Sequence, residues 1–257
     1  MGGSKSLPVQ NRCPAPGEQL AASRVKTGIF LQVRLDSRRL PRKALLPLPG
    51  GNVIQHAMRA LKLIKADIHA LLTDGQSANE LSDLAEVEGF ALFTGPSADV
   101  LERFCRAIGH FKVTRVIRAT GDNPLVSAGL AQNLLSVHGA EGLDLSHFSG
   151  LPVGTGVEVV EAKVLIESSA RTDDPYEHEH ITTYAYRHPD DFRIGRIPCP
   201  ETCYLPPARV TLDTEADYQL ISRIFAELFR KKPLETEEIV LWFKENHILN
   251  IPSSQRA

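Results

Sequence analysis

Short apolar runs alternate with amphipathic segments along the first half of the chain. Thr27–Val33 is an apolar run that predicts a buried strand, and Asn52–Ile64 carries apolar residues at helical spacing. The same alternation predicts strands at Asp67–Thr73, Ala91–Thr94 and Thr114–Ala119, with helices at Ala78–Glu88, Ala98–Gly109 and Ala128–His138. Strands separated by helices of about ten residues predict an α/β, Rossmann-like fold, a mainly parallel sheet with helices on both faces.

The second half of the chain has a less regular pattern. It predicts strands at Val157–Val160, Phe192–Ile197 and Arg209–Leu212, with helices at Ala162–Ser169, Tyr176–Tyr186, Glu215–Phe229 and Thr236–Asn246. Residues 1–26 are rich in Pro, Gly and Ser, so we expect a flexible tail there. We expect residues 27–257 to form one domain with an inserted segment at about 140–200, and the part around His138–Gly156 suits a subunit interface better than the sheet.

Composition narrows the classes of function. The net charge of −2 favours neither nucleic acid nor an anionic membrane as a partner. No apolar run approaches the roughly 20 residues of a membrane span. The four cysteines (Cys13, Cys105, Cys199 and Cys203) are too scattered for a disulfide framework, and the first residues lack the apolar core of a secretion signal. We therefore expect a cytoplasmic protein.

A basic segment follows the first predicted strand directly. It reads Arg34-Leu35-Asp36-Ser37-Arg38-Arg39-Leu40-Pro41-Arg42-Lys43 and holds five cations. The first strand–helix loop of an open α/β sheet is a common phosphate site, and arginine suits bidentate phosphate contacts. A solvated surface loop remains the alternative. The segment matches neither a Walker P-loop nor the G-x-G-x-x-G pattern.

Two carboxylates stand at predicted strand ends. Asp122 follows Gly121 in the segment Arg118–Pro124, and Asp213 lies in the segment Val210–Thr214. Separated carboxylates facing one phosphate site are the usual ligands of Mg²⁺. Each Asp could instead cap a helix or turn.

A polar stretch, Asp173–Tyr184, combines acidic, histidine and tyrosine residues. On a continuous helix Tyr176, His180 and Tyr184 would share one face, with Glu177 beside them. The stripe suits either packing against the sheet or a wall for a polar acceptor. The H-E-x-x-H zinc pattern is absent.

Together these segments resemble the SpsF-type cytidylyltransferases, relatives of the CMP-KDO and acylneuraminate cytidylyltransferases, from about Thr27 to Ile224. The loop matches R-x-x-S-x-R-x-P-x-K. The further matches are Asp99-Val100-Leu101 with Arg103, Thr120-Gly121-Asp122 with Pro124, Asp174-Pro175-Tyr176-Glu177 with Glu179-His180, Tyr186-Arg187-His188-Pro189, and Asp213-Thr214 with Asp217.

The resemblance implies a nucleotide-diphospho-sugar transferase type of fold that moves CMP from CTP to a sugar-like acceptor with release of pyrophosphate. Roles are implied for residues in four groups. The catalytic cations are Arg34, Arg39 and Lys43; the nucleotide-binding residues are Ser37, Thr73, Asp74, Gly95, Arg118 and Gly121; the Mg²⁺ ligands are Asp122 and Asp213; the acceptor-binding residues are Glu158, Asp174, Glu177, His180 and Arg187. A homodimer is also implied, with acceptor binding and dimerisation in the 140–200 segment.

Three positions depart from the family pattern. Arg42 replaces a usual glycine, Gly156 replaces an acidic residue two positions before Glu158, and Thr94 replaces an arginine. Arg42 and Gly156 keep open the alternative of a non-catalytic homologue that binds nucleotide or sugar. A metal-dependent glycosyltransferase that uses a nucleotide-sugar is a second alternative, because it too needs a Rossmann-like crevice and a metal.

Overall fold

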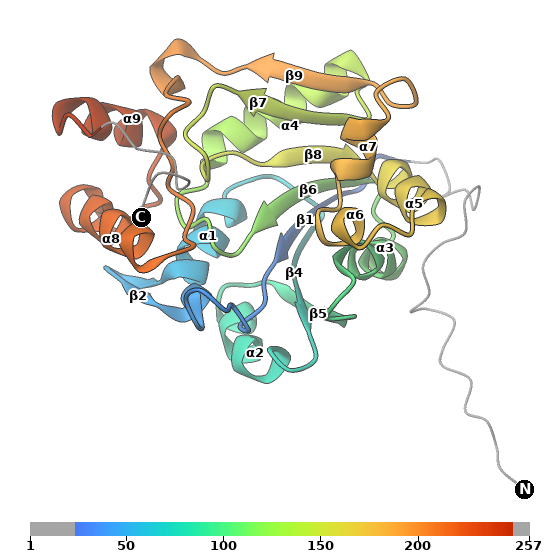
Figure 1. The fold of residues 1–257 in the computed structure, drawn as a ribbon, viewed down its shortest axis with the longest axis horizontal. Helices are drawn as coiled ribbons and strands as arrows, with labels where there is room; N and C mark the ends of the chain where they lie inside the picture. Colours follow the sequence, from blue (N-terminus) through green and yellow to red (C-terminus); the bar gives the residue numbers. More distant parts are fainter. Residues whose placement is uncertain (1–23, 249–257) are drawn as a thin grey trace, which may run out of the picture.

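The computed structural model describes residues 24–248, and within them seven strands form one sheet (Figure 1). Their order across the sheet is β5-β4-β1-β6-β8-β7-β9. The strands are β1 (Thr27–Gln32), β4 (Ile68–Asp74), β5 (Ala91–Gly95), β6 (Arg115–Thr120), β7 (Leu145–Ser149), β8 (Glu158–Glu161) and β9 (Ile194–Pro198). A small antiparallel pair, β2 (Pro47–Leu48) and β3 (Gly51–Asn52), lies outside this sheet.

The strand β1 lies beside the point where the direction of winding of the sheet reverses. It pairs in parallel with β4 on one side and with β6 on the other. The chain runs outward from β1 through β4 to β5 and then returns to β6, so the direction of winding reverses between β1 and β6. β8 alone runs antiparallel to its neighbours β6 and β7. The predicted α/β, mainly parallel, Rossmann-like fold is confirmed, and such a reversal opens a ligand crevice at the carboxyl ends of the strands.

Helices cover both faces of the sheet. They are α1 (Val53–Lys62), α2 (Ala78–Val87), α3 (Val100–Phe111), α4 (Ala128–Glu141), α5 (Ala162–Arg171), α6 (Pro175–Glu179), α7 (Thr183–Arg187), α8 (Glu215–Leu228) and α9 (Thr236–Glu245).

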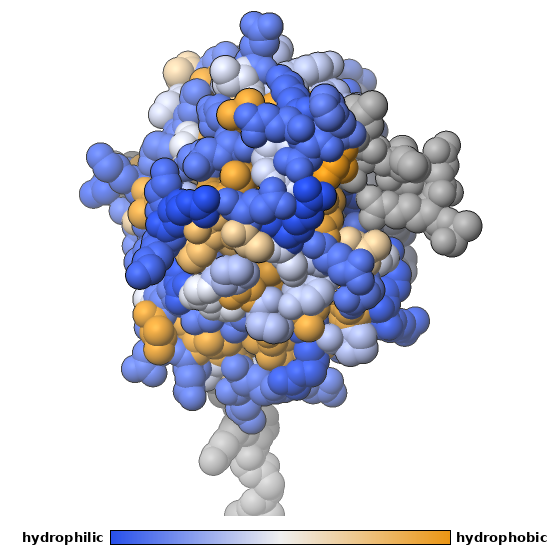
Figure 2. All heavy atoms as spheres, turned by 90° about the vertical axis from the view of Figure 1, so that its left-hand side faces the viewer, coloured by the Kyte–Doolittle hydropathy of each residue, from blue (hydrophilic) through white to orange (hydrophobic). Residues whose placement is uncertain are grey.

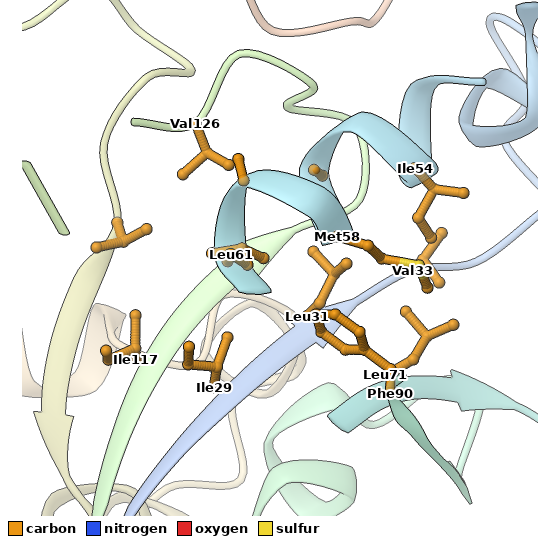
Figure 3. Close-up of a cluster of buried hydrophobic side chains, with 14 of the residues drawn as sticks. Ile29, Leu31, Val33, Ile54, Met58, Leu61, Leu71, Phe90, Ile117 and Val126 are labelled. Carbon is orange, nitrogen blue, oxygen red and sulfur yellow. The ribbon is translucent and has the colours of Figure 1, made fainter. Parts of the chain in front are cut away.

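Alternation along β1 separates two hydrophobic cores. Ile29 and Leu31 pack toward α1 and its neighbours, where Met58 and Leu61 of that helix meet the strands (Figure 3). Phe30 points to the opposite face, where α3, α5 and α7 supply the partners. This follows from the two-residue period of a strand. Burial on both faces fixes the register of β1 and with it the position of the loop that follows.

A third core joins α8 and α9 to the segment before α8, to β2 and to the start of α1. Val210 and Leu212 are fully buried there, against Phe225 of α8 and Phe243 of α9. Seen from the side that carries these two helices, hydrophilic residues predominate and apolar residues show in patches between them (Figure 2). The segment that ends at Asp213 is therefore anchored by packing.

Three elements differ from the sequence-based expectation. Leu145–Ser149 is strand β7 and lies inside the sheet, although the pattern around it suggested an interface. Arg209–Leu212 forms no strand, because only a single bridge from Arg209 to Val153 pairs it. The helix expected over Tyr176–Tyr186 is broken into α6 and α7, since the chain leaves helical geometry at His180.

The expected flexible tail at residues 1–26 lies largely outside the described residues, as does Cys13. No helix within residues 24–248 is long and apolar enough to span a membrane.

Candidate active site

A cavity of about 840 Å³ opens where β1 and β6 end. Both ends of the basic segment, Arg34 and Lys43, line it, together with Asp122 and Asp213. The cavity sits at the point where the winding of the sheet reverses, as expected for a ligand site in an open α/β fold.

Lys43 lines the cavity and contacts both carboxylates. Its Nζ donates to Asp122 Oδ2 at 2.6 Å, to the Leu212 carbonyl at 2.7 Å and to Asp213 Oδ1 at 3.0 Å. Because both carboxylate oxygens touch one nitrogen, they lie within about 6 Å of each other. Residues far apart in sequence therefore build an oxygen cage around one positive charge.

Asp213 is surrounded by cations. Arg209 donates to its Oδ2 at 2.6 Å, and Arg39 lies 3.2 Å from Oδ1. Burial acts to raise the pKa of Asp213, but the hydrogen bond and charge of Lys43, with Arg39 and Arg209, outweigh it and lower that pKa. Capping of α8 falls to Thr214 and Asp217, which form a capping box, so the Asp213 carboxylate is not the helix cap.

Arg34 lines the cavity and connects two segments of its wall. Its guanidinium donates to the Ser97 carbonyl at 3.2 Å and to Glu179 Oε1 at 3.0 Å, which links the loop after β1 to α6. Ser37 and Arg39 also line the cavity. The basic segment is therefore a folded wall of the cavity.

Arg42 has a left-handed backbone, with φ 56°. Glycine adopts this conformation at lower cost than other residues, which explains why the family pattern favours glycine here. Arg42 does not line the cavity and forms an ion pair with Glu80 of α2. Arg42 therefore adds an ion pair that connects the loop to α2.

Two predicted nucleotide-binding residues do not reach the cavity wall. Thr73 and Asp74 are buried: Thr73 donates to the Val33 carbonyl, and Asp74 accepts from the backbone and side chain of Ser77. Both carboxylate oxygens of Asp74 are used inside the protein, because they fix the turn after β4. Their observed contribution is to hold the loop.

The two predicted glycines allow close approaches. A Cβ at Gly121 would lie 2.9 Å from Val33, and Gly121 lines the cavity. A Cβ at Gly95 would lie 2.6 Å from Arg103, so Gly95 makes room for that arginine and does not line the cavity.

A second cavity of about 710 Å³ adjoins the first, and Arg118 and Thr120 line both. Glu158 lines the second cavity, where Arg118 donates to it at 2.7 Å and Tyr186 at 2.8 Å. Burial acts to raise the pKa of Glu158, but Arg118 and these hydrogen bonds lower it. Arg118 therefore binds a carboxylate of the protein at the junction of the two cavities.

The remaining predicted acceptor residues separate into two groups. His180 lines the first cavity. Asp174, Glu177 and Arg187 instead pair with one another, with Arg187 Nη1 lying 3.0 Å from Asp174 Oδ2 and 2.7 Å from Glu177 Oε1. Neither cavity includes them. Their geometry joins α6 to α7.

The expected aromatic stripe does not form one wall. Tyr176 is exposed whereas Tyr184 is buried and stacks on His188, because the helix breaks between them. Tyr176 retains its ring contact with His180.

Sequence reasoning did not assign a site role to Arg103, Arg209 or Glu179, which also line the first cavity. Arg103 is 1% exposed and donates to the carbonyls of Pro96 and Ser97. For Arg103 and Glu179 the available signals were the motif matches Asp99-Val100-Leu101 with Arg103 and Glu179-His180. The sequence contained no signal for Arg209, because its role depends on a contact with Asp213.

Among residues 24–248, no group of three or more His, Cys, Asp or Glu side chains is placed to hold a metal ion. Any cation site in the first cavity would therefore use the Asp122–Asp213 pair with backbone, water or ligand oxygens.

Comparison with known proteins gives consistent results. The family model described as Cytidylyltransferase matches residues 29–251. The spore coat polysaccharide biosynthesis protein SpsF of Bacillus subtilis (strain 168) is 32% identical over 227 residues, which cover 84% of this chain and 93% of that protein. The resemblance inferred from the motifs is thereby confirmed.

Two solved structures share the fold. A cytidylyltransferase from Leptospira borgpetersenii has a TM-score of 0.81 at 22% identity, covering 89% of this chain and 98% of that chain. CMP:2-keto-3-deoxy-manno-octonic acid synthetase complexed with CTP has a TM-score of 0.59 at 17% identity, and the match covers 79% of this chain and 99% of that chain. The family match and the SpsF relative, together with this fold, show that the chain belongs to the cytidylyltransferase family of nucleotidyltransferase enzymes.

Proposed function

We propose that this protein transfers CMP from CTP to a sugar or sugar-acid-like acceptor in the synthesis of a surface polysaccharide or glycan. The main support for this function is the Lys43–Asp122–Asp213 cluster, which lies in a cavity lined by several arginines. An acceptor oxygen attacks the α-phosphorus, the bond to the bridging oxygen breaks, and pyrophosphate leaves. No covalent enzyme intermediate is required.

The cations of the first cavity suit a triphosphate. Arg34, Arg39 and Lys43 come from one loop, and Arg209 approaches from the segment before α8. Catalysis in this arrangement depends on positioning the phosphates and neutralising the charge that develops on them.

The Asp122–Asp213 pair fits Mg²⁺. Two carboxylate oxygens and the Leu212 carbonyl already surround a positive charge, the Lys43 ammonium. Mg²⁺ takes oxygen ligands and keeps places for water and phosphate. Asp122 and Asp213 would hold the ion, which would supply further charge neutralisation. Lys43 would then be available to the phosphates.

The second cavity suits the acceptor. It adjoins the first at Arg118 and Thr120 and carries further polar groups, including Glu158 and Arg196. An acceptor there would meet the nucleotide near the carboxyl end of β6.

The test is pyrophosphate release from CTP and Mg²⁺ across a panel of sugars and sugar acids. We expect Asp122→Asn and Asp213→Asn each to lower turnover by about 100-fold or more, since about 3 kcal/mol of charge stabilisation corresponds to that factor. The control is Asp83→Asn on the exposed face of α2.

Several results would overturn the proposal. Nucleoside diphosphate release from a nucleotide-sugar would indicate a glycosyltransferase, and nucleotide binding without turnover would indicate a non-catalytic homologue. Full activity in both Asn variants would remove the metal assignment. The proposal also includes a cytoplasmic homodimer.

A further inference from the structure

The second cavity contains a histidine whose protonation is constrained by its neighbours. His147 of β7 lines the cavity. Its Nδ1 lies 2.9 Å from the hydroxyl oxygen of Tyr186 in α7, and the Tyr186 hydroxyl donates to Glu158 Oε1 at 2.8 Å. A chain of polar contacts thus runs from His147 to Glu158.

The direction of each hydrogen bond in this chain can be deduced. Glu158 also accepts from Arg118 Nη1 at 2.7 Å and from Thr182 Oγ1, and its pKa is lowered, so it is ionised and offers no proton. Burial, with the negative charge of Glu158, raises the pKa of Tyr186, so the phenol keeps its hydrogen. A charged carboxylate is the stronger acceptor, so Tyr186 donates its one hydrogen to Glu158.

The contact between His147 and Tyr186 then requires a proton from the imidazole. The tyrosine oxygen can only accept there, so Nδ1 of His147 bears hydrogen and donates. In a neutral imidazole the other nitrogen is then a bare acceptor. Within residues 24–248, no hydrogen bond to His147 Nε2 is formed.

The charge state of His147 depends on several packed elements. Across the sheet it faces Glu158 of β8 and Arg196 of β9, and Tyr186 lies above it from α7. Burial lowers the pKa of His147, Glu158 opposes this and Arg196 adds to it, so the pKa lies below the ordinary 6.5. Near neutral pH the imidazole is uncharged.

We infer that His147 Nε2 is the general base that takes the proton from the attacking hydroxyl of the acceptor in the second cavity. This rests on the function proposed above. As the acceptor oxygen bonds to the α-phosphorus and pyrophosphate departs, the hydroxyl proton moves to Nε2. The imidazolium is balanced through Tyr186 by ionised Glu158, and its proton then passes to water. Tyr186 is a positioning residue that fixes the tautomer.

The first experiment measures the tautomer without any substrate. Protein labelled with ¹⁵N-histidine is examined by two-bond ¹H–¹⁵N correlation NMR at pH 7.5, and the His147→Gln variant assigns the signal. We expect the Nδ1–H form in the wild type and a shift toward the Nε2–H form in Tyr186→Phe. An Nε2–H form in the wild type overturns the inference.

The second experiment measures turnover and its pH dependence. General-base catalysis contributes about 10²–10⁴-fold, so His147→Gln should lose that factor in kcat with CTP affinity within about twofold. The wild type should keep its activity at about pH 6.5 and lose it only at lower pH, because the pKa of His147 lies below its ordinary value and protonation removes the base. The variant should lack this limb. Tyr186→Phe should show an intermediate loss.

The control is His110→Gln, at an exposed histidine of α3. Turnover in His147→Gln within threefold of the wild type, with its acid limb intact, overturns the role of His147 alone. Absence of pyrophosphate release by the wild type with every acceptor instead overturns the proposed function, so the two failures are distinguishable.

Discussion

Replacing Lys43 by Met removes the positive charge that joins Asp122 to Asp213 while keeping a side chain of similar length. The Lys43 side chain is 15% exposed and donates to three oxygens, two of them on carboxylates. Asp213 retains Arg39 and Arg209, whereas Asp122 loses its ion-pair partner. Substitution therefore leaves one carboxylate uncompensated near another.

The expected loss is about 2 kcal/mol of unfolding free energy, because hydrogen bonds to charged groups are worth about 1.5–3 kcal/mol and these groups keep some contact with water. For a chain of this size that lowers Tm by roughly 4–8 °C. A loop projecting into solvent would have predicted almost no change. CTP affinity should fall about ten- to a hundredfold.

The assay is thermal unfolding of both proteins, with calorimetry of CTP binding. The matched control is Lys163→Met, which removes an ion pair to Asp144 from a side chain that is 63% exposed and should cost less than about 1 kcal/mol. Mg²⁺ alone should raise the Tm of Lys43→Met more than that of the wild type, because no ammonium competes for the oxygens. Equal Tm values for Lys43→Met, Lys163→Met and wild type would show that the Lys43 contacts with the two carboxylates do not stabilise the fold.

Three further predictions concern the scaffold. Burial is the main cause that lowers the pKa of His56 to about 4. The unfolding free energy of the wild type should therefore fall by up to about 3 kcal/mol between pH 6.5 and pH 4. In urea titrations His56→Phe should flatten this pH dependence, and equal slopes for the two proteins would contradict the prediction. Arg42→Ala should be less stable than Arg42→Gly by about 1 kcal/mol, because both lose the Glu80 contact and only alanine keeps a Cβ at φ 56°; equal melting temperatures would remove that explanation. Light scattering at micromolar concentration should give a dimer mass, and a monomer would count against the proposed assembly.

The sequence predicted the first half of the fold well because β1 and β4 are apolar runs that are mostly buried, and α1 and α3 each have a clear apolar stripe. β7 escaped prediction because His147 and Ser149 interrupt its apolar pattern, and its pairing with β8 and β9 is non-local. Arg209–Leu212 looked like a strand because Val210 and Leu212 are buried, but they are buried against α8 and α9.

The candidate site was predictable where a loop follows a strand. Arg34, Lys43 and Asp122 line the first cavity because they follow β1 and β6, whose carboxyl ends meet there. Asp213 also lines it but reaches it from a segment that is not a strand. Of the residues predicted only by resemblance, some line a cavity and others do not. Asp74 uses both carboxylate oxygens within its own turn, and the Glu177–Arg187 pair joins two helices whose break no periodicity revealed.

We expect the cavity at the ends of β1 and β6 to bind CTP in preference to other nucleotides. Thermal unfolding with saturating Mg²⁺ and equal concentrations of CTP, ATP, GTP or UTP tests this preference, because a ligand that binds only the native state raises apparent stability according to its affinity. CTP should give the largest increase in Tm, and Lys43→Met should reduce that increase. Equal increases for all four nucleotides would contradict a preference for CTP and would leave only a generic phosphate site.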